Sequence, residues 1–166
     1  MQSRCGGGDL RGGGAGLILL AYQGISPLSR LIRWQTRSIY SHIAISHEGQ
    51  VVEALGTRGR VVLAKDFREY HTPGTVVTVL EVPGVDDDAA WDFALEQVGK
   101  PYDYRGIVRF VTRQSYHQNG RWFCSELASA ACSAGGVELL RIPHHESSPR
   151  DVAASPVLEF VESRVC

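Results

Sequence analysis

The chain has 166 residues, of which 43% are hydrophobic and 21% are charged. This length and composition suffice for the core of one globular domain and are too apolar for a disordered chain. The formal net charge of −1 lacks the excess of basic residues that binding to nucleic acid requires. The longest apolar run, over 16–22, is too short to cross a bilayer, so no transmembrane segment is expected. We expect a small molecule or a peptide as the partner, with the oligomeric state left open.

The first 15 residues are rich in glycine and predict a flexible leader ahead of a single domain over 16–166. This stretch lacks the apolar segment of a secretory signal peptide. We therefore expect a cytoplasmic protein, with delivery to the cell wall by another route as the alternative.

An apolar run predicts a first strand over 17–22, and Ser26 followed by Pro27 predicts the start of a helix that runs to about Thr36. Leu28, Leu31 and Ile32 lie on one face of this helix. Further strands are expected over 41–46, 51–55, 61–64, 75–82 and 157–161. Asp86, Asp87 and Asp88 are expected to cap a second helix, which continues over 89–98. Further helices are expected from 124 to the glycines at 135–136 and from 149. Helices beside a mainly antiparallel, hairpin-connected sheet make the fold class α+β.

A hairpin with Glu48 and Gly49 in its turn brings His42 and Glu53 to one side of the sheet. His47 then faces Gln50, and Glu53 lies diagonal to His42 at roughly 7–8 Å between the backbones. A glutamate side chain can close that distance and orient the imidazole. This pair is the base and the orienting group of a nucleophilic triad.

Cys124 is the candidate nucleophile, because it lies at the expected N-terminus of a helix. There the helix dipole favours a thiolate, and free backbone N–H groups can stabilise an oxyanion. Cys132, two helical turns later, is expected to be an inert core residue, and Cys5 and Cys166 are expected to be exposed.

Five short motifs occur in an order that resembles the circularly permuted branch of the NlpC-type papain-like cysteine peptidases, the YiiX-like group. They are Tyr40-Ser41-His42-Ile43-Ala44-Ile45, Val52-Glu53-Ala54, Gly99-Lys100-Pro101-Tyr102-Asp103-Tyr104, Phe123-Cys124-Ser125-Glu126-Leu127 and Ser148-Pro149-Arg150-Asp151-Val152. The same branch includes lecithin:retinol acyltransferase-like enzymes, whose nucleophile motif is richer in Asn, Glu and His. The sequence Cys124-Ser125-Glu126-Leu127 departs from that motif.

The resemblance implies a permuted papain-like fold and an amidase or peptidase with Cys124 as nucleophile, His42 as base and Glu53 as orienting residue. It also implies that Tyr102 lies near the nucleophile. We expect Ser41 and Ser125, beside the catalytic residues, to contact substrate. The implied substrate is a cell-wall peptide or fragment, or a lipid-like acyl amide or ester, and no cofactor is implied.

Two other functions remain open on the sequence alone. One is a ligand-binding module on the same scaffold with an unreactive Cys124, and the other is a thiol acyltransferase in which a second acceptor replaces water. The remaining polar residues are given no role in the site. His71 and His117 are expected in loops. The segment His144-His145-Glu146 has no third metal ligand in sight and is expected to be a solvated loop. A solvated basic face of the first helix is expected from Arg30, Arg33 and Arg37.

Overall fold

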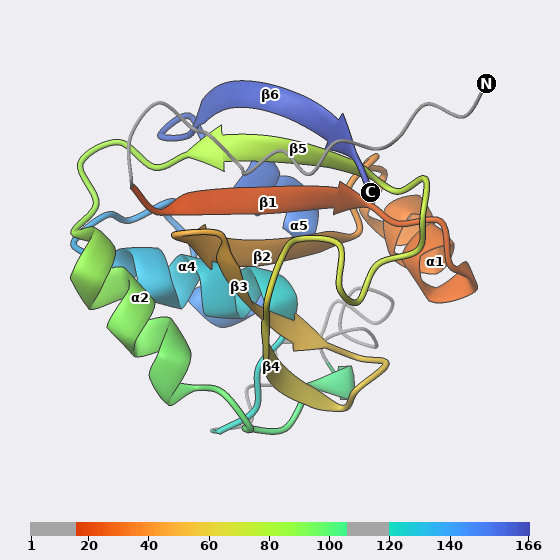
Figure 1. The fold of residues 1–166 in the computed structure, drawn as a ribbon, viewed down its shortest axis with the longest axis horizontal. Coiled ribbons are helices and arrows are strands. Elements are labelled where there is room, and N and C mark those ends of the chain that lie inside the picture. The colour runs from red at the N-terminus through yellow and green to blue at the C-terminus, as the bar shows by residue number, and fades with distance from the viewer. Residues whose placement is uncertain (1–15, 106–119) are drawn as a thin grey trace.

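A six-stranded antiparallel sheet forms the centre of the computed structural model, which describes residues 16–105 and 120–166 (Figure 1). The strands are β1 (Ile18–Gln23), β2 (His42–His47), β3 (Gln50–Leu55), β4 (Arg60–Ala64), β5 (Val76–Glu81) and β6 (Glu159–Val165), in the spatial order β4-β3-β2-β1-β5-β6. Every pairing between neighbouring strands is antiparallel. Together with the helices, this sheet confirms the α+β class. The predicted leader and His117 lie outside the described residues.

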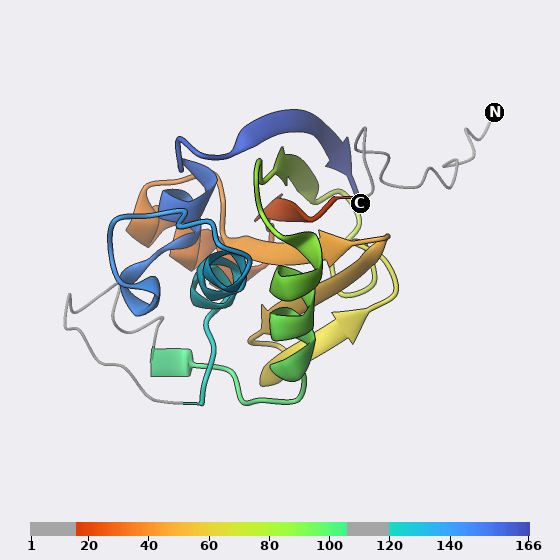
Figure 2. The same ribbon diagram turned by 90° about the vertical axis from the view of Figure 1, so that its left-hand side faces the viewer.

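The helices α2 (Asp87–Glu96), α4 (Cys124–Ala134) and α5 (Pro149–Ala153) pack against one face of the sheet, mainly at β2 and β3. Figure 2 shows α2 and α4 next to each other on this face. The core between the helices and the sheet includes Leu19, Ile43, Ile45, Val52, Leu127, Ala128 and Ala131. Small side chains on α4 permit its close approach to the strands. The packing fixes the N-terminus of α4 against the β2–β3 hairpin.

The opposite face of the sheet has its own cluster of buried side chains, among them Leu20, Tyr22, Ala44, Val51, Val77 and Val79. The segment 65–75, between β4 and β5, contributes Phe67 to this cluster. The buried hydroxyl of Tyr22 donates a hydrogen bond to the Phe67 carbonyl at 3.0 Å. This bond anchors the segment 65–75, which also carries His71, to β1.

The caps predicted from the sequence are present. Ser26 accepts a hydrogen bond from the Ser29 N–H at 3.2 Å, and Pro27 begins α1 (Pro27–Thr36). Asp86 caps α2 in the same way, accepting from the Ala89 N–H at 3.1 Å. Such side-chain acceptors satisfy backbone donors that have no partner within the helix. The helix α2 ends at Glu96, before the expected Val98, and the strand β6 begins and ends later than expected.

The helix α1 leaves most of its apolar side uncovered. Of Leu28, Leu31 and Ile32, which the sequence places on one face, only Ile32 is buried. The reason is that α1 lies at one end of the sheet (Figure 1), and neither core cluster includes a residue from it. An apolar stripe predicts which side chains share a face, but it does not say what covers that face.

Cys166 also differs from its expected exposure. It is half-buried, and its Sγ lies 4.0 Å from the Phe67 carbonyl oxygen. Desolvation raises the pKa of this thiol to about 11. Within the described ranges, no helix has the length and apolar character needed to cross a membrane.

Candidate active site

The β2–β3 hairpin has the predicted turn and register. Glu48 and Gly49 both have positive φ, at 48° and 83°, as a tight two-residue hairpin turn requires. His47 pairs with Gln50, and the ladder continues through Ser46 with Val51 to Ile45 with Val52. The ladder stops after these pairs, so His42 and Glu53 lie beyond its end.

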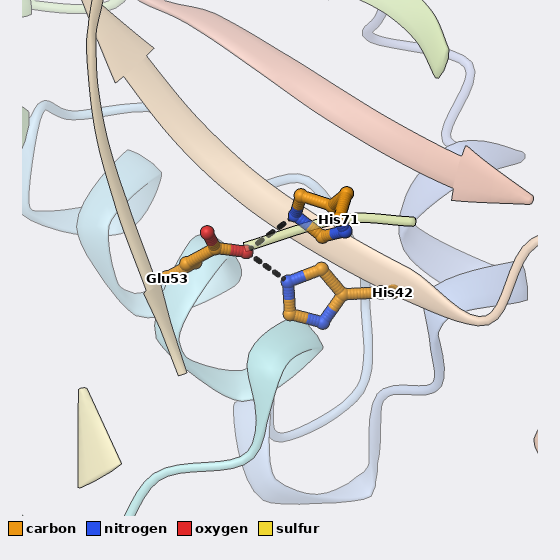
Figure 3. Close-up of side chains that lie close together, drawn as sticks. All are labelled: His42, Glu53 and His71. Atoms are coloured by element: carbon orange, nitrogen blue, oxygen red, sulfur yellow. Dashed lines mark hydrogen bonds and ion pairs between the residues drawn. The ribbon is translucent and has the colours of Figure 1, made fainter. Parts of the chain in front are cut away.

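Glu53 is a buried carboxylate held by two imidazoles (Figure 3). Nε2 of His42 lies 2.7 Å from Glu53 Oε2, which agrees with the contact expected from the hairpin. Nε2 of His71 lies 3.0 Å from the same oxygen. An ionised carboxylate can only accept hydrogen bonds, so both rings donate from Nε2.

His71 is the site residue that the sequence analysis missed. It lies outside the regular strands, in the segment 65–75, and its ring stacks on Tyr22 with centroids 3.7 Å apart and an interplanar angle of 14°. Tyr22 is fully buried. The stack fixes the ring with Nε2 aimed at Glu53. No local pattern marks His71, because its position depends on how a non-repetitive segment folds back over the sheet.

Charge pairing shifts the pKa values at this site in opposite directions. Burial lowers the pKa of His42, but the negative charge of Cys124, a hydrogen bond with its sulfur and the contact with Glu53 together raise it from 6.5 to about 10. Burial raises the pKa of Glu53, yet the hydrogen bonds from His42 and His71 lower it to about 2. At neutral pH the pair is therefore ionised.

Cys124 is the first residue of α4, as expected for the candidate nucleophile. Phe123 is the N-cap, and its backbone N–H donates to the Glu126 carboxylate at 3.5 Å. The cysteine is 2% exposed, so little of its thiol reaches solvent in this conformation. The N-terminus of a helix is the end at which the backbone dipoles favour an anion.

The orientation of His42 assigns its two ring nitrogens to different partners. Nε2 donates to Glu53, which leaves Nδ1 as the nitrogen available to Cys124. In Figure 3 this second nitrogen points towards the first turn of α4. The arrangement brings together the thiol, the imidazole and the carboxylate that the sequence singled out.

A cavity opens beside His42 and His71, and Tyr102 is one of its lining residues. Tyr102 is the residue that the sequence analysis places near the nucleophile. The lining also includes Ser41, His42, His71, Leu55 and, from α1 and the residues before it, Ile25, Ser26, Leu28, Ser29 and Ile32. Burial and the charge of Cys124 raise the pKa of Tyr102 well above its usual value, so its hydroxyl stays neutral. Cys124 is not among the lining residues, although Tyr102 and His42 both border on it.

The two serines expected to contact substrate make internal hydrogen bonds. Ser41 Oγ accepts from the Gly24 N–H at 3.0 Å and donates to the Tyr22 carbonyl at 3.3 Å, although the residue borders the cavity. Ser125 Oγ is buried away from the cavity and donates to the Ser147 carbonyl at 2.7 Å. These contacts give both side chains a structural role.

Cys132 is buried in the core as expected, and desolvation raises the pKa of its thiol to about 12. The segment His144–Glu146 forms a short 3-10 helix instead of a loop. Among the described residues, the donors close enough together to bind a metal ion are those of His42, Glu53 and His71, which lie within 4.8 Å of one another. This cluster coincides with the candidate active site.

No known family model matches the chain, and no curated protein sequence is similar to it. Among solved structures, the fold is similar to that of the metalloprotein YiiX from Escherichia coli O157:H7, with a TM-score of 0.64. The two chains are 19% identical, and the alignment covers 90% of this chain and 97% of YiiX. The comparison therefore supports a YiiX-like fold over nearly the whole chain.

The shifted pKa of His42 gives a first testable prediction. In an NMR titration of the ring protons, His42 should keep its proton through neutral pH and lose it near pH 10. In Cys124→Ala the same proton should be lost at lower pH, because the negative charge that contributes most to the upward shift is gone. A His42→Asn spectrum assigns the signal. An unchanged pKa in Cys124→Ala would contradict the contact between sulfur and ring.

The same shift affects stability with a definite sign. The pKa of His42 is higher in the folded chain than in the unfolded chain, so its contribution to stability is complete below pH 6.5 and is lost as the pH rises towards 10. Glu53 behaves in the opposite way, and its contribution is lost as the pH falls from about 4.5 towards 2.

Proposed function

We propose that the protein is a cysteine hydrolase that cleaves an amide or ester bond. Cys124 acts as nucleophile, His42 as general base and acid, and Glu53 as the residue that orients His42. The observation that carries this proposal is the position of the His42 ring, which bonds a buried carboxylate through one nitrogen and borders a cysteine at a helix N-terminus through the other. The chain order His, Glu, Cys is that of a circularly permuted papain-like domain, which we propose as the fold.

The reaction begins with the thiolate and imidazolium pair of Cys124 and His42. Sγ attacks the substrate carbonyl and forms a C–S bond, and the backbone N–H groups at the start of α4 stabilise the negative oxygen. Nδ1 of His42 then donates its proton to the leaving nitrogen or oxygen as that bond breaks. The product of this half is a thioester on Cys124.

Water completes the cycle. His42 accepts a proton from a water molecule at Nδ1, the hydroxide attacks the thioester carbonyl, and the thiolate leaves. Throughout, Nε2–H of His42 remains bonded to Glu53, which keeps the ring in one tautomer and balances its charge. A thiol acyltransferase would differ only in the acceptor that replaces water, and a non-catalytic module would lack the thioester.

His71 acts as a positioning residue in this scheme. Its bond to Glu53 Oε2, at 3.0 Å, shares the carboxylate with His42 and helps to keep the carboxylate ionised. His71 itself is held by its stack on Tyr22. Glu53, which orients His42, is thus itself held in place by His71.

Thiol labelling tests the proposal. At about pH 6, iodoacetamide should alkylate Cys124 at least about tenfold faster than Cys166, because thiolate and not thiol reacts, and the pKa of Cys166 is raised to about 11. His42→Asn should slow the labelling of Cys124 towards the rate of Cys166. Peptide mapping by mass spectrometry identifies each labelled cysteine.

Cys166→Ser is the matched control for this experiment, and its Cys124 should react as in the wild type. Equal labelling rates for Cys124 and Cys166 at about pH 6 would favour the non-catalytic module. The same conclusion would follow if Cys124 were labelled at the same rate in His42→Asn as in the wild type.

A metal centre at His42, Glu53 and His71 is the second candidate function. The donor types suit zinc, which binds histidine nitrogen and carboxylate oxygen, and the structurally similar YiiX is described as a metalloprotein. Zinc bound tetrahedrally to such donors holds them roughly 3.3 Å apart. Here they lie 2.7 Å and 3.0 Å apart, at hydrogen-bond spacing. A ring nitrogen that donates its proton to Glu53 must also lose that proton to become a ligand, so a bound zinc and the proposed triad exclude each other at His42.

Metal analysis separates the two candidates. After incubation with zinc and dialysis at neutral pH, we expect well below about one zinc per chain, because the metal must displace the protons that hold the site together. One zinc per chain that is lost in His71→Gln, but kept in the control His144→Gln, would instead favour the metal centre. Mass spectrometry of the digested protein gives the metal content.

A further inference from the structure

The helix α1 exposes a stripe of large apolar side chains. Leu28, Leu31 and Trp34 follow one another at intervals of three residues, so they lie along one side of the helix, with exposed fractions of 36%, 43% and 72%. Ile25, which precedes the N-cap Ser26, is 49% exposed. An amphipathic helix of a globular protein normally turns its apolar stripe to the core. A contiguous exposed stripe instead indicates an interaction surface.

Basic residues flank this stripe. Arg30 and Arg37 are exposed beside it, and the half-buried Arg33 donates from Nη1 to the Gly24 carbonyl at 3.3 Å. The segment 25–39 includes no aspartate or glutamate. Arg150, from α5, reaches the C-terminal end of α1, where its Nη1 donates to the Thr36 carbonyl at 3.4 Å. The face of α1 is therefore apolar and positively charged, although the whole chain has a net charge of −1.

The same helix borders the cavity of the candidate active site. Leu28, Ser29 and Ile32 line that cavity together with His42 and Tyr102. Leu28 is both exposed and part of the lining, so the apolar stripe continues from the outer surface to the mouth of the cavity. A molecule held on the stripe therefore lies beside the cavity that His42 lines.

We propose that α1 docks on the surface of an anionic lipid bilayer. Leucine side chains and Trp34 enter the boundary between head groups and acyl chains, where tryptophan is favoured, and the arginines pair with lipid phosphates. A second copy of this chain fits the face less well, because a symmetric contact would bring the arginines of both copies together without a carboxylate from α1.

Docking of this kind narrows the substrate class. An enzyme that rests on a bilayer with its cavity beside the contact meets acyl lipids in preference to soluble peptides. This narrowing to an acyl amide or ester of a lipid depends on the proposed hydrolase function, whereas the docking itself does not.

Vesicle sedimentation tests the docking. The full chain should sediment with vesicles of phosphatidylcholine and phosphatidylglycerol, and much less with phosphatidylcholine alone. The double variant Leu31→Ser/Trp34→Ser, which leaves the cavity lining intact, should bind at least about tenfold more weakly. Arg30→Gln/Arg37→Gln should weaken binding by about fivefold for each arginine. Phe160→Ser, at a side chain that is 67% exposed on β6, is the matched control and should bind normally.

Three results would overturn the docking proposal. They are a lack of binding to anionic vesicles, an equal loss in Phe160→Ser, and a dimer in gel filtration that Leu31→Ser/Trp34→Ser converts to a monomer. Cys124→Ala should still bind vesicles, so a failure of the hydrolase proposal is seen separately, as a docked protein without turnover. If the protein cleaves a soluble short-chain ester but does not bind vesicles, the docking proposal is wrong and the hydrolase proposal stands.

Discussion

The site depends on one constraint, the burial of the Glu53 carboxylate inside a sheet. Removing an ionised carboxylate from water costs several kcal/mol, and this cost must be offset by hydrogen bonds and opposite charge. Two imidazoles from different segments meet the same oxygen and lower the pKa of Glu53 to about 2. Their bonds link the first residue of β2 and the segment 65–75 to the carboxylate on β3. His42 and His71 are therefore positioned by the Glu53 carboxylate, whose charge they balance.

The candidate site lies where the β2–β3 ladder ends. The paired residues of the hairpin, from Ile45 to Val52, hold the strands together near the turn. Beyond them, His42 borders both the carboxylate on β3 and the N-terminus of α4. The packing of α4 against β2 and β3 thus brings Cys124, which is distant in the sequence, to the same imidazole.

Local patterns in the sequence were enough to predict the caps at Ser26 and Asp86 and the register of the hairpin, because each depends on residues a few positions apart. The contact of His42 with Glu53 followed from that register. The role of His71 could not be predicted, since it depends on a segment without a repeating pattern. The exposure of Leu31 could not be predicted either, because the apolar stripe of α1 does not reveal that the helix lies at the end of the sheet.

The most direct test of the proposed hydrolase is to trap the thioester. A rapid acid quench of the protein with an activated ester, followed by intact-mass and peptide analysis, should reveal the acyl group on Cys124. Glu53→Gln should form the same adduct more slowly, because His42 loses the carboxylate that orients it but the nucleophile is intact. Turnover that leaves no acyl group on Cys124 and continues undiminished in Cys124→Ala would contradict the account.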